Sequence, residues 1–132
     1  VSVRLQQPEF FLEDIPTKEL VYQACVYYGI TNPEIVVAQS ILETGLYKSQ
    51  GCLKDNNLFG LYNSRKKEYF KFDHWTGSVL AYKNMIQYKQ RDDEEYYSFL
   101  DRIGYAEDTL YNQKLKTIVK RYGLLDFCKQ EK

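Results

Sequence analysis

The sequence predicts a mostly helical fold of the α+β class. Apolar side chains recur at helical spacing along several segments, and one stretch near the middle has the pattern of a short β-hairpin. Helices grouped around a minor sheet are typical of α+β proteins. The chain has 132 residues, which is the length of one domain, and its 44% hydrophobic and 27% charged residues are typical of a globular protein.

The first fifteen residues show no periodic pattern. They are mixed in character and are followed by Pro16, so we expect an extended N-terminal arm over residues 1–15 and one folded domain over residues 16–132. A helix is predicted from Thr17, because the apolar residues that follow fall on one helical face. These residues are Leu20, Val21, Ala24, Cys25 and Tyr28. Gly29 is expected to end this helix.

A second helix is predicted to begin at Asn32-Pro33, with asparagine as the N-cap and proline in the first helical position. Its apolar residues form a broad stripe, made of Ile35, Ala38, Ile41, Leu42 and Leu46. Gly45 lies near its end. The pattern therefore predicts that Glu43 lies in the last turn of a largely buried helix.

The middle of the chain is predicted to contain a loop and then the hairpin. Residues 49–57 include Gly51 and the run Asp55–Asn57, which is typical of a turn-rich loop. Residues 59–62 and 68–72 are rich in aromatic side chains and flank a polar turn, so they are the predicted strands. Three more helices are predicted, over residues 76–90, 93–102 and 110–122. Val79, Tyr82 and Ile86 are expected to face inward.

Charge and composition argue against several classes of partner. Basic and acidic residues balance at 18 each, so no net field favours nucleic acid. No apolar run is long enough to span a membrane. Residues with metal-binding side chains lack the spacing of a metal site, and no glycine-rich phosphate loop is present. We therefore expect no metal and no cofactor.

The three cysteines are Cys25, Cys52 and Cys128, and their odd number leaves at least one free thiol. Cys25 lies in an apolar helical stretch and is interpreted as a core residue, although a Cys25–Cys128 bridge stays open. The 13 Tyr, 7 Phe and 1 Trp suit either a core or a groove in which rings pack on the apolar faces of sugars. We expect most of them to be in the core.

Glu43 is the acidic residue with the most unusual neighbours, since it lies among Ile41, Leu42 and Leu46. Apolar surroundings disfavour a charged carboxylate and raise its pKa. An acid that stays protonated near neutral pH can donate a proton to a glycosidic oxygen, as the catalytic acid of lysozyme does. The alternative is a helix-end glutamate that faces water, and this segment alone favours that alternative.

Three blocks of sequence add to this hypothesis. They are Ala38–Gly45 (AQSILETG), Asn56–Leu61 (NNLFGL), and Gly104–Asp108 (GYAED) followed by Tyr111, Leu115 and Tyr122–Leu124. In this order and spacing they resemble the glucosaminidase domain of glycoside hydrolase family 73, found in bacterial autolysins and flagellar peptidoglycan hydrolases. The resemblance runs from about Thr17 to Leu125. It implies a lysozyme-like fold with a short β-hairpin lobe, so that residues 16–132 form a glucosaminidase catalytic domain.

The resemblance also implies roles for individual residues. It assigns the general acid to Glu43, and it matches the family's conserved tyrosine to Tyr105, which would position the sugar or the reacting groups unless it is a core residue. Asn57 is expected to hydrogen-bond substrate. Phe59 matches the same segment leading into the cleft, although packing is the favoured role for it. Gly60 fits a place where backbone approaches closely.

A second carboxylate is less clearly marked. Glu68 on the predicted hairpin is the best match, Asp73 is next and Asp55 is third; for Glu68 a solvated surface charge is the alternative. A carboxyl separation of about 5–5.5 Å would indicate retention and about 6.5–9.5 Å inversion. Attack by the acetamido oxygen of the substrate would need no second carboxylate as nucleophile.

The sequence departs from the family pattern at Gly45–Tyr47, where many relatives have Gly-Trp-Gly. Loss of that tryptophan would alter sugar stacking, and Tyr47 or Trp75 are candidates to replace it. Tyr62 is expected to line the same groove. Trp75 has a second interpretation, as a packing anchor at a helix start.

Together these features predict a monomeric peptidoglycan hydrolase, periplasmic or secreted, that cleaves the β-1,4 bond after N-acetylglucosamine in glycan strands. One alternative is a glycan-binding module without catalysis. A second is a lytic transglycosylase on the same fold, whose product would end in an anhydro-muramic sugar. A third is an endo-N-acetylglucosaminidase that acts on the N-glycans of glycoproteins.

Overall fold

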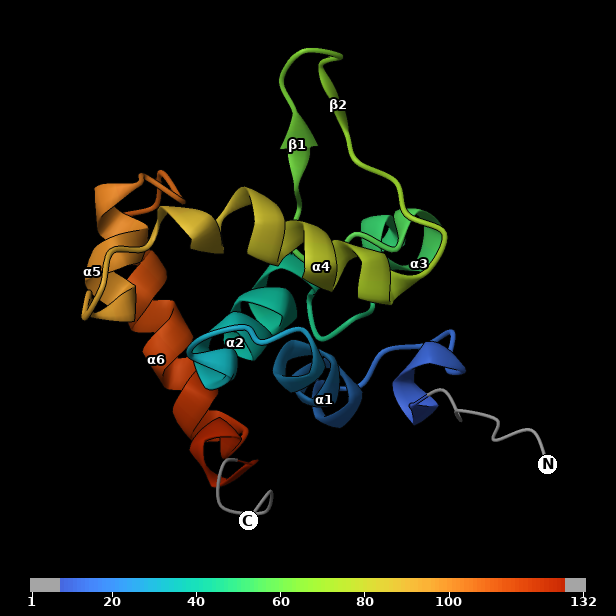
Figure 1. Cartoon of the computed structure of the whole chain (residues 1–132), viewed down its shortest axis with the longest axis horizontal. Helices are drawn as coiled ribbons and strands as arrows, with labels where there is room; N and C mark the ends of the chain where they lie inside the picture. The colour runs from blue at the N-terminus through green and yellow to red at the C-terminus, as the bar shows by residue number, and fades with distance from the viewer. Residues whose placement is uncertain (1–7, 128–132) are drawn as a thin grey trace, which may run out of the picture.

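The computed structural model describes residues 8–127, and its centre is helix α2, Pro33–Thr44 (Figure 1). Eight of its twelve side chains are buried, so this helix is covered by the rest of the protein on most of its surface. Helices α1 (Lys18–Tyr27) and α6 (Tyr111–Arg121) pack against it, and α4 (Trp75–Met85) packs against α1. The core formed by these helices contains most of the large apolar side chains.

The sheet is a single antiparallel hairpin of two strands, β1 (Tyr62–Asn63) and β2 (Glu68–Tyr69). Tyr62 pairs with Tyr69, and Asn63 pairs with Glu68. The hairpin projects from the body of the protein beside α4 (Figure 1). Together with the helices it confirms the mostly helical α+β class.

The predicted helix boundaries at the start of the chain agree closely with the structure. Thr17 caps α1 with its side chain, which accepts a hydrogen bond from the backbone of Leu20 at 3.2 Å. Gly29 follows the helix with a positive φ of 73°. Asn32 precedes α2 in the left-handed conformation, without a side-chain cap, and Gly45 ends α2 with a φ of 57°.

Two predictions of irregular structure are wrong. The expected loop over residues 49–57 contains helix α3, Gln50–Asp55, because Ser49 caps it by accepting from the backbone of Cys52 at 3.1 Å. The expected extended arm contains a 3-10 helix, η1 (Glu9–Phe11), because Phe10 turns into the core. Residues 1–7 of that arm lie outside the described residues.

The later helices are shorter than predicted. α4 ends at Met85, and a 3-10 turn, η2 (Gln87–Lys89), completes the segment; Ile86 between them is half-buried. Helix α5 covers Tyr96–Arg102, and a last 3-10 turn, η3 (Leu124–Asp126), follows α6. Within the described part of the chain, no helix is long and apolar enough to cross a membrane.

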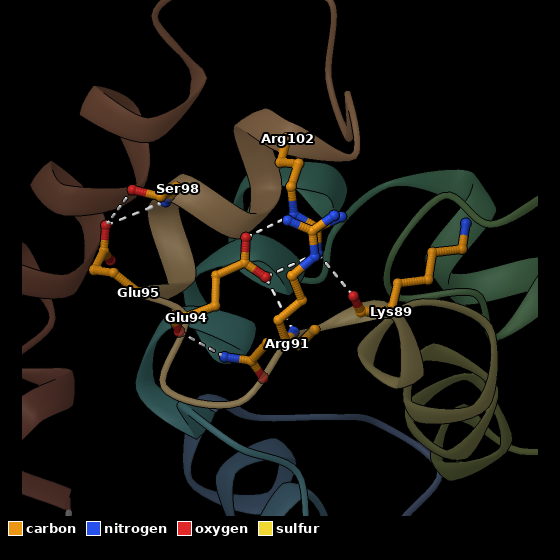
Figure 2. Close-up of polar contacts among 7 residues, drawn as sticks. Lys89, Arg91, Glu94, Glu95, Ser98 and Arg102 are labelled. Atoms are coloured by element: carbon orange, nitrogen blue, oxygen red, sulfur yellow. Dashed lines mark hydrogen bonds and ion pairs between the residues drawn. The ribbon is translucent and has the colours of Figure 1, made fainter.

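A charged fork fixes the connection between η2 and α5 (Figure 2). Both oxygens of Glu94 accept from Arg102, at 2.7 and 2.8 Å, and Arg102 also donates to the carbonyl of Lys89 at 2.8 Å. The hydrogen bonds from Arg102 hold the pKa of Glu94 at about 2. These hydrogen bonds hold the turn after η2, which contains Gln90, against helix α5.

The thiols of Cys25 and Cys52 are free and buried. Burial raises the pKa of the Cys25 thiol above its ordinary value, in agreement with its prediction as a core residue. Cys128, and with it the possible Cys25–Cys128 bridge, lies outside the described residues.

Candidate active site

Glu43 lies in the last turn of α2, where the predicted helix pattern put it. The chain turns sharply after it, because Gly45, Leu46 and Tyr47 all adopt positive φ angles. The hydroxyl of Thr44 accepts from the backbone of Tyr47 at 2.8 Å and so closes this turn. The sharp turn leaves the Glu43 side chain at an open helix end.

The Glu43 carboxyl is bounded by a phenol and a glycine. Its Oε1 accepts from the Tyr111 hydroxyl at 3.4 Å, and a β-carbon on Gly60 would lie 3.3 Å from its Oε2. Burial of the carboxyl by these surroundings raises the pKa of Glu43, and the Tyr111 hydrogen bond opposes this in part. Although the side chain as a whole is exposed, its carboxyl favours the protonated form more than a free glutamate does.

A pocket of about 240 Å³ opens beside Glu43. The residues that line it are Glu43, Ser49, Cys52, Asp55, Asn57, Gly60 and Tyr69. A larger pocket of about 570 Å³ shares no residue with it and contains none of the predicted site residues. We therefore take the smaller pocket as the candidate active site.

The structure brings a different second carboxyl to this pocket from the one that ranked first in the sequence. Asp55 lines it, at the end of α3. Glu68 lies exposed on β2 and is not among the lining residues. Asp73 lines a separate pocket together with His74. The sequence ranked Asp55 third, because the family resemblance implied a second carboxylate on the hairpin.

Asn57 is buried, and its side-chain amide makes all of its hydrogen bonds within the protein. Its amide nitrogen donates to the carbonyls of Leu61 and Phe70 at 2.9 and 3.0 Å. Its oxygen accepts from the backbone of Leu61 at 3.0 Å and of Phe59 at 3.4 Å. The side chain thus anchors the base of the hairpin, and its amide has no hydrogen left to donate to a substrate.

Tyr105 is half-buried near Glu43. Its hydroxyl donates to the carbonyl of Phe59 at 3.3 Å, and its ring lies 5.6 Å from that of Tyr111. Burial, followed by the nearby Tyr111 and Glu43, raises the pKa of Tyr105 well above its ordinary value. This tyrosine therefore stays protonated and can act only as a neutral hydrogen-bonding or packing group.

Three predicted groove aromatics lie in the core. Trp75 is 0% exposed and donates its indole N–H to the carbonyl of Glu13 at 2.7 Å, which makes it a packing anchor. Tyr47 is buried with its hydroxyl 2.7 Å from that of Ser40, and Phe59 is buried with its ring 4.6 Å from that of Tyr82. None of the three lines the Glu43 pocket. This agrees with the favoured packing role of Phe59 and with the packing interpretation of Trp75, and it gives no support to the sugar contact expected of Tyr47.

Tyr62 is exposed, as a groove residue must be. It meets Tyr69 across the hairpin with ring centroids 5.2 Å apart, edge to face, and the two are 48% and 58% exposed. Tyr69 also lines the Glu43 pocket. Sequence reasoning missed Tyr69, although the hairpin register alone pairs it with Tyr62.

Sequence reasoning also missed the roles of Gln39 and Tyr111, which link Glu43 to the buried core through hydrogen bonds. Gln39 precedes Glu43 by four residues on the same face of α2, and it donates to the Tyr111 hydroxyl at 3.2 Å. A buried glutamine one helical turn before a candidate acid is a signal that the sequence already contained. Among residues 8–127, no group of three or more His, Cys, Asp or Glu side chains could hold a metal ion.

Comparison with known proteins places this geometry in context. The family model described as glucosaminidase, mannosyl-glycoprotein endo-beta-N-acetylglucosaminidase, matches residues 18–124. Among solved structures, the catalytic domain of the autolysin Auto from Listeria monocytogenes is similar, with a TM-score of 0.61 and 19% identity. The match covers 94% of this chain and 90% of that one, and at this identity it shows a shared fold. No curated protein sequence matches significantly.

Proposed function

The chain belongs to the glucosaminidase family of glycoside hydrolases, and on that basis we propose that it is a peptidoglycan hydrolase with Glu43 as its general acid. The bond cleaved is the β-1,4 linkage after N-acetylglucosamine in the glycan strands. Glu43 donates its proton to the glycosidic oxygen as the bond from that oxygen to C1 breaks. Water supplies the hydroxyl group to C1 and a proton that restores Glu43.

The observation that carries this proposal is the environment of one carboxyl. Glu43 lies at a helix end beside a pocket, and burial raises its pKa above the ordinary range. Such a carboxyl holds a proton at a pH where a free glutamate has lost it, which the leaving oxygen requires. The likeness to an autolysin catalytic domain supports the choice of peptidoglycan among glycans.

We assign the second carboxyl to Asp55, because it lines the same pocket as Glu43. Its role is to accept a proton from the attacking water or to stabilise positive charge on the sugar. Glu68 is next to Tyr69 on β2, but unlike Tyr69 it is exposed and does not line the pocket. Asp55→Asn is expected to lower kcat by roughly 10²-fold, and Glu68→Gln is the matched control. A large loss of kcat in Glu68→Gln, without one in Asp55→Asn, would assign the second carboxyl to Glu68 on the hairpin.

The exposed ring pair Tyr62 and Tyr69 is the proposed platform for the glycan strand. Aromatic faces pack on the apolar C–H faces of pyranose rings while the phenol hydroxyl stays hydrated. Tyr69 lines the pocket and Tyr62 extends the surface along the hairpin. Because the substrate is the cell wall, we propose a place of action in the bacterial cell envelope, periplasmic or secreted.

Digestion of purified peptidoglycan tests the function directly. We expect the wild-type protein to release fragments that end in reducing N-acetylglucosamine, as seen by mass spectrometry. Glu43→Gln should lower their rate of release by about 10²–10⁴-fold while strand binding persists.

Other products would revise the proposal. Anhydro-muramic ends would indicate a transglycosylase, and equal release by wild type and variant would exclude Glu43 as the acid. If peptidoglycan is bound but never cut, the chain is a binding module. Cleavage of a mannosyl-glycoprotein glycan instead would change the substrate and leave the role of Glu43 in place.

A further inference from the structure

A continuous chain of hydrogen bonds crosses the buried core and ends at Glu43. Its members come from five different elements, η2, α5, α4, α2 and α6. In order they are Gln87, Tyr96, Tyr82, Gln39 and Tyr111. All five are buried, and none is more than 9% exposed. Polar groups buried this deeply are costly unless every one of them is paired, so such a chain requires a reason.

The backbone of Thr31 fixes the outer end of this chain. Its N–H donates to Oε1 of Gln87 at 3.0 Å, and its carbonyl accepts from Nε2 of Gln87 at 2.8 Å. A backbone N–H can only donate and a carbonyl can only accept, so the Gln87 amide has one possible orientation. The second hydrogen of Nε2 is therefore donated to the Tyr96 hydroxyl, at 3.0 Å.

Each following link inherits its direction from the one before. Tyr96 accepts from Gln87, a donor that cannot take the Tyr96 proton, so within residues 8–127 the acceptor left for this proton is the Tyr82 hydroxyl at 2.6 Å. Tyr82 then donates to Oε1 of Gln39 at 2.5 Å. Gln39 therefore presents its nitrogen, not its oxygen, to the Tyr111 hydroxyl, at 3.2 Å. The protons point one way along the whole chain.

The last proton in the chain is the one on Tyr111. Because the Tyr111 oxygen accepts from Gln39, its own proton is free for Oε1 of Glu43, at 3.4 Å. This distance is long, as is common for catalytic groups before substrate binds. In a neutral carboxyl the carbonyl oxygen accepts better than the hydroxyl oxygen, so a phenol that donates to Oε1 favours the proton on Oε2.

We propose that this one-way chain, which rests on the proposed function, positions the Glu43 carboxyl so that Oε1 accepts from Tyr111 and Oε2 carries the proton for the substrate. Tyr111 is the positioning residue in contact with the acid, and Gln39 and Tyr82 set the direction of its hydroxyl. Oε2 lies on the side of Gly60, where the missing side chain leaves the oxygen open to the pocket. Once the proton has left Oε2, the Tyr111 hydrogen bond stabilises the carboxylate that remains.

The other titratable groups near Glu43 do not supply this hydrogen bond. Those that surround it from α3, β2 and the segment before α6 are Asp55, Cys52, Tyr69 and Tyr105. Asp55 carries like charge, and the Tyr105 hydroxyl is directed to the carbonyl of Phe59. Within residues 8–127, Tyr111 is the donor to the Glu43 carboxyl, and no Lys or Arg lines the pocket.

The first test is Tyr111→Phe, which removes one hydroxyl and keeps the ring. A donated hydrogen bond favours the charged carboxylate, so its loss should raise the pKa of Glu43. We expect a higher midpoint for the Glu43 carboxyl carbon in an NMR titration. In activity, the alkaline limb of the kcat–pH profile should move to higher pH. The kcat itself should fall by roughly 10- to 100-fold, because the carboxyl is no longer held in one orientation, while KM changes little.

The second test separates the chain from its last link. Tyr82→Phe leaves Tyr111 in place and removes the donor to Oε1 of Gln39, so the pKa of Glu43 should rise in the same direction by a smaller amount. Tyr47→Phe is the matched control, because it removes a buried hydroxyl that bonds to Ser40 and not to the chain. It should leave the Glu43 titration where it is. An unchanged titration in Tyr82→Phe, or an equal change in Tyr47→Phe, would overturn the proposal.

A wild-type measurement guards against variants that fail to fold. The hydroxyl protons of Tyr82 and Tyr96 should exchange slowly with water and give separate proton NMR signals, and rapid exchange would show that the chain is not formed. The carboxyl titration needs no substrate. A protein that cuts no glycan but shows the expected titrations would refute the proposed function and leave the positioning chain in place.

Discussion

Gly60 lies next to Oε2 of Glu43, the oxygen that faces the pocket. A side chain at this position is expected to affect both the stability of the fold and catalysis. Its φ of 62° is strained for any L-residue, so Gly60→Ala should destabilise the fold by about 1–2 kcal/mol. The added methyl would also lie 3.3 Å from Oε2 of Glu43 and displace the carboxyl. We therefore expect kcat to fall by roughly tenfold or more, measured alongside urea unfolding.

Gly29→Ala provides the control for backbone strain. Gly29 has a similar φ of 73°, and a β-carbon there would make only an ordinary contact, 3.6 Å from the Lys83 nitrogen. It should cost similar stability with kcat kept. If both alanine variants keep full activity, the space at Gly60 has no catalytic role.

Ionisation of Glu43 should lower the stability of the protein. Its pKa is raised in the folded state above the ordinary value of 4.5, so the folded chain binds this proton more tightly than the unfolded chain. That stabilisation is fully present below pH 4.5 and is lost as the pH rises through the folded pKa. Glu43→Gln cannot ionise, so its melting temperature relative to wild type should be higher at pH 7 than at pH 4. A relative gain by wild type as the pH rises would contradict the raised pKa.

The sequence placed Glu43 correctly in the last turn of α2, whereas it left the groove or core position of Tyr47 and Trp75 open, for one physical reason. An acid among apolar neighbours at a helix end is a local pattern, and α2 preserved it. Whether a ring such as Trp75 or Tyr47 lies in a groove or in the core depends on which distant segment covers it. The Trp75 indole N–H donates to the carbonyl of Glu13, which lies 62 positions earlier in the chain. No residue near Trp75 in the sequence indicates that contact.

At the scale of elements, the hairpin is held at its base by Asn57. Asn57→Asp replaces two amide donors with acceptors, which leaves the carbonyls of Leu61 and Phe70 facing a carboxylate. We expect a loss of about 2–3 kcal/mol in the free energy of unfolding. The loss should shrink at low pH, where a protonated carboxyl regains one donor. Urea unfolding at pH 7 and pH 4 measures both.

Asn63→Asp is the same substitution at the other end of the hairpin. There the side-chain oxygen accepts from the backbone of Arg65 and Lys66, at 3.1 and 3.3 Å, and a carboxylate accepts as well as an amide. Stability should stay within about 0.5 kcal/mol of wild type. An equal loss in both variants would show that added charge, and not the lost donors, is responsible.

The hairpin also carries the proposed sugar platform. Tyr69→Ala should raise KM for glycan strands by roughly tenfold, which corresponds to about 1.4 kcal/mol of lost contact, with a smaller change in kcat. Tyr62→Ala should act in the same direction. Tyr88→Ala is the control, since Tyr88 is 70% exposed but lines the pocket of about 570 Å³ that shares no residue with the candidate site. If KM rises in Tyr88→Ala and not in Tyr69→Ala, the glycan binds in the pocket of about 570 Å³.

The elements themselves were predictable where their signals are local. Thr17, Gly29 and Gly45 mark the ends of α1 and α2 through capping and left-handed turns, and the structure keeps those ends. Helix α3 was missed because six residues are too few to show a periodic pattern, and its local signs are limited to the cap by Ser49 and the left-handed Asn56 at its end. That miss moved Asp55 from a helix to a loop.

At the scale of the whole molecule, the fold class follows from hydrophobic periodicity, but the polar interior does not. Gln39, Tyr82, Tyr96 and Tyr111 each lie on an apolar helical face, where a single polar residue is read as packing. They meet only because α2, α4, α5 and α6 converge on one core. A chain of hydrogen bonds between four helices is a property of the tertiary structure, so periodicity along the sequence has no means of showing it.

The folded unit begins before residue 16, and its N-terminal segment is expected to stabilise the whole molecule. Phe10 is buried against the core, and the carbonyl of Glu13 accepts from both Trp75 and His74 at 2.7 Å. Deleting residues 1–15 exposes the surface under Phe10, at about 1.5–3 kcal/mol. It also leaves the buried Trp75 N–H unpaired, at about 1–3 kcal/mol.

The two terms together predict a loss of roughly 2.5–6 kcal/mol in urea unfolding for the deleted chain. Two point variants in the full chain show where the loss arises. Phe10→Ala should cost about 3 kcal/mol by opening a cavity, whereas Leu12→Ala should stay within about 0.5 kcal/mol, because Leu12 is 68% exposed. If the deleted chain is as stable as the full one, the domain starts at residue 16 and the arm is dispensable. Because the arm holds Trp75 at the start of α4, and α4 carries Tyr82, its loss should also weaken the hydrogen-bond chain that ends at Glu43.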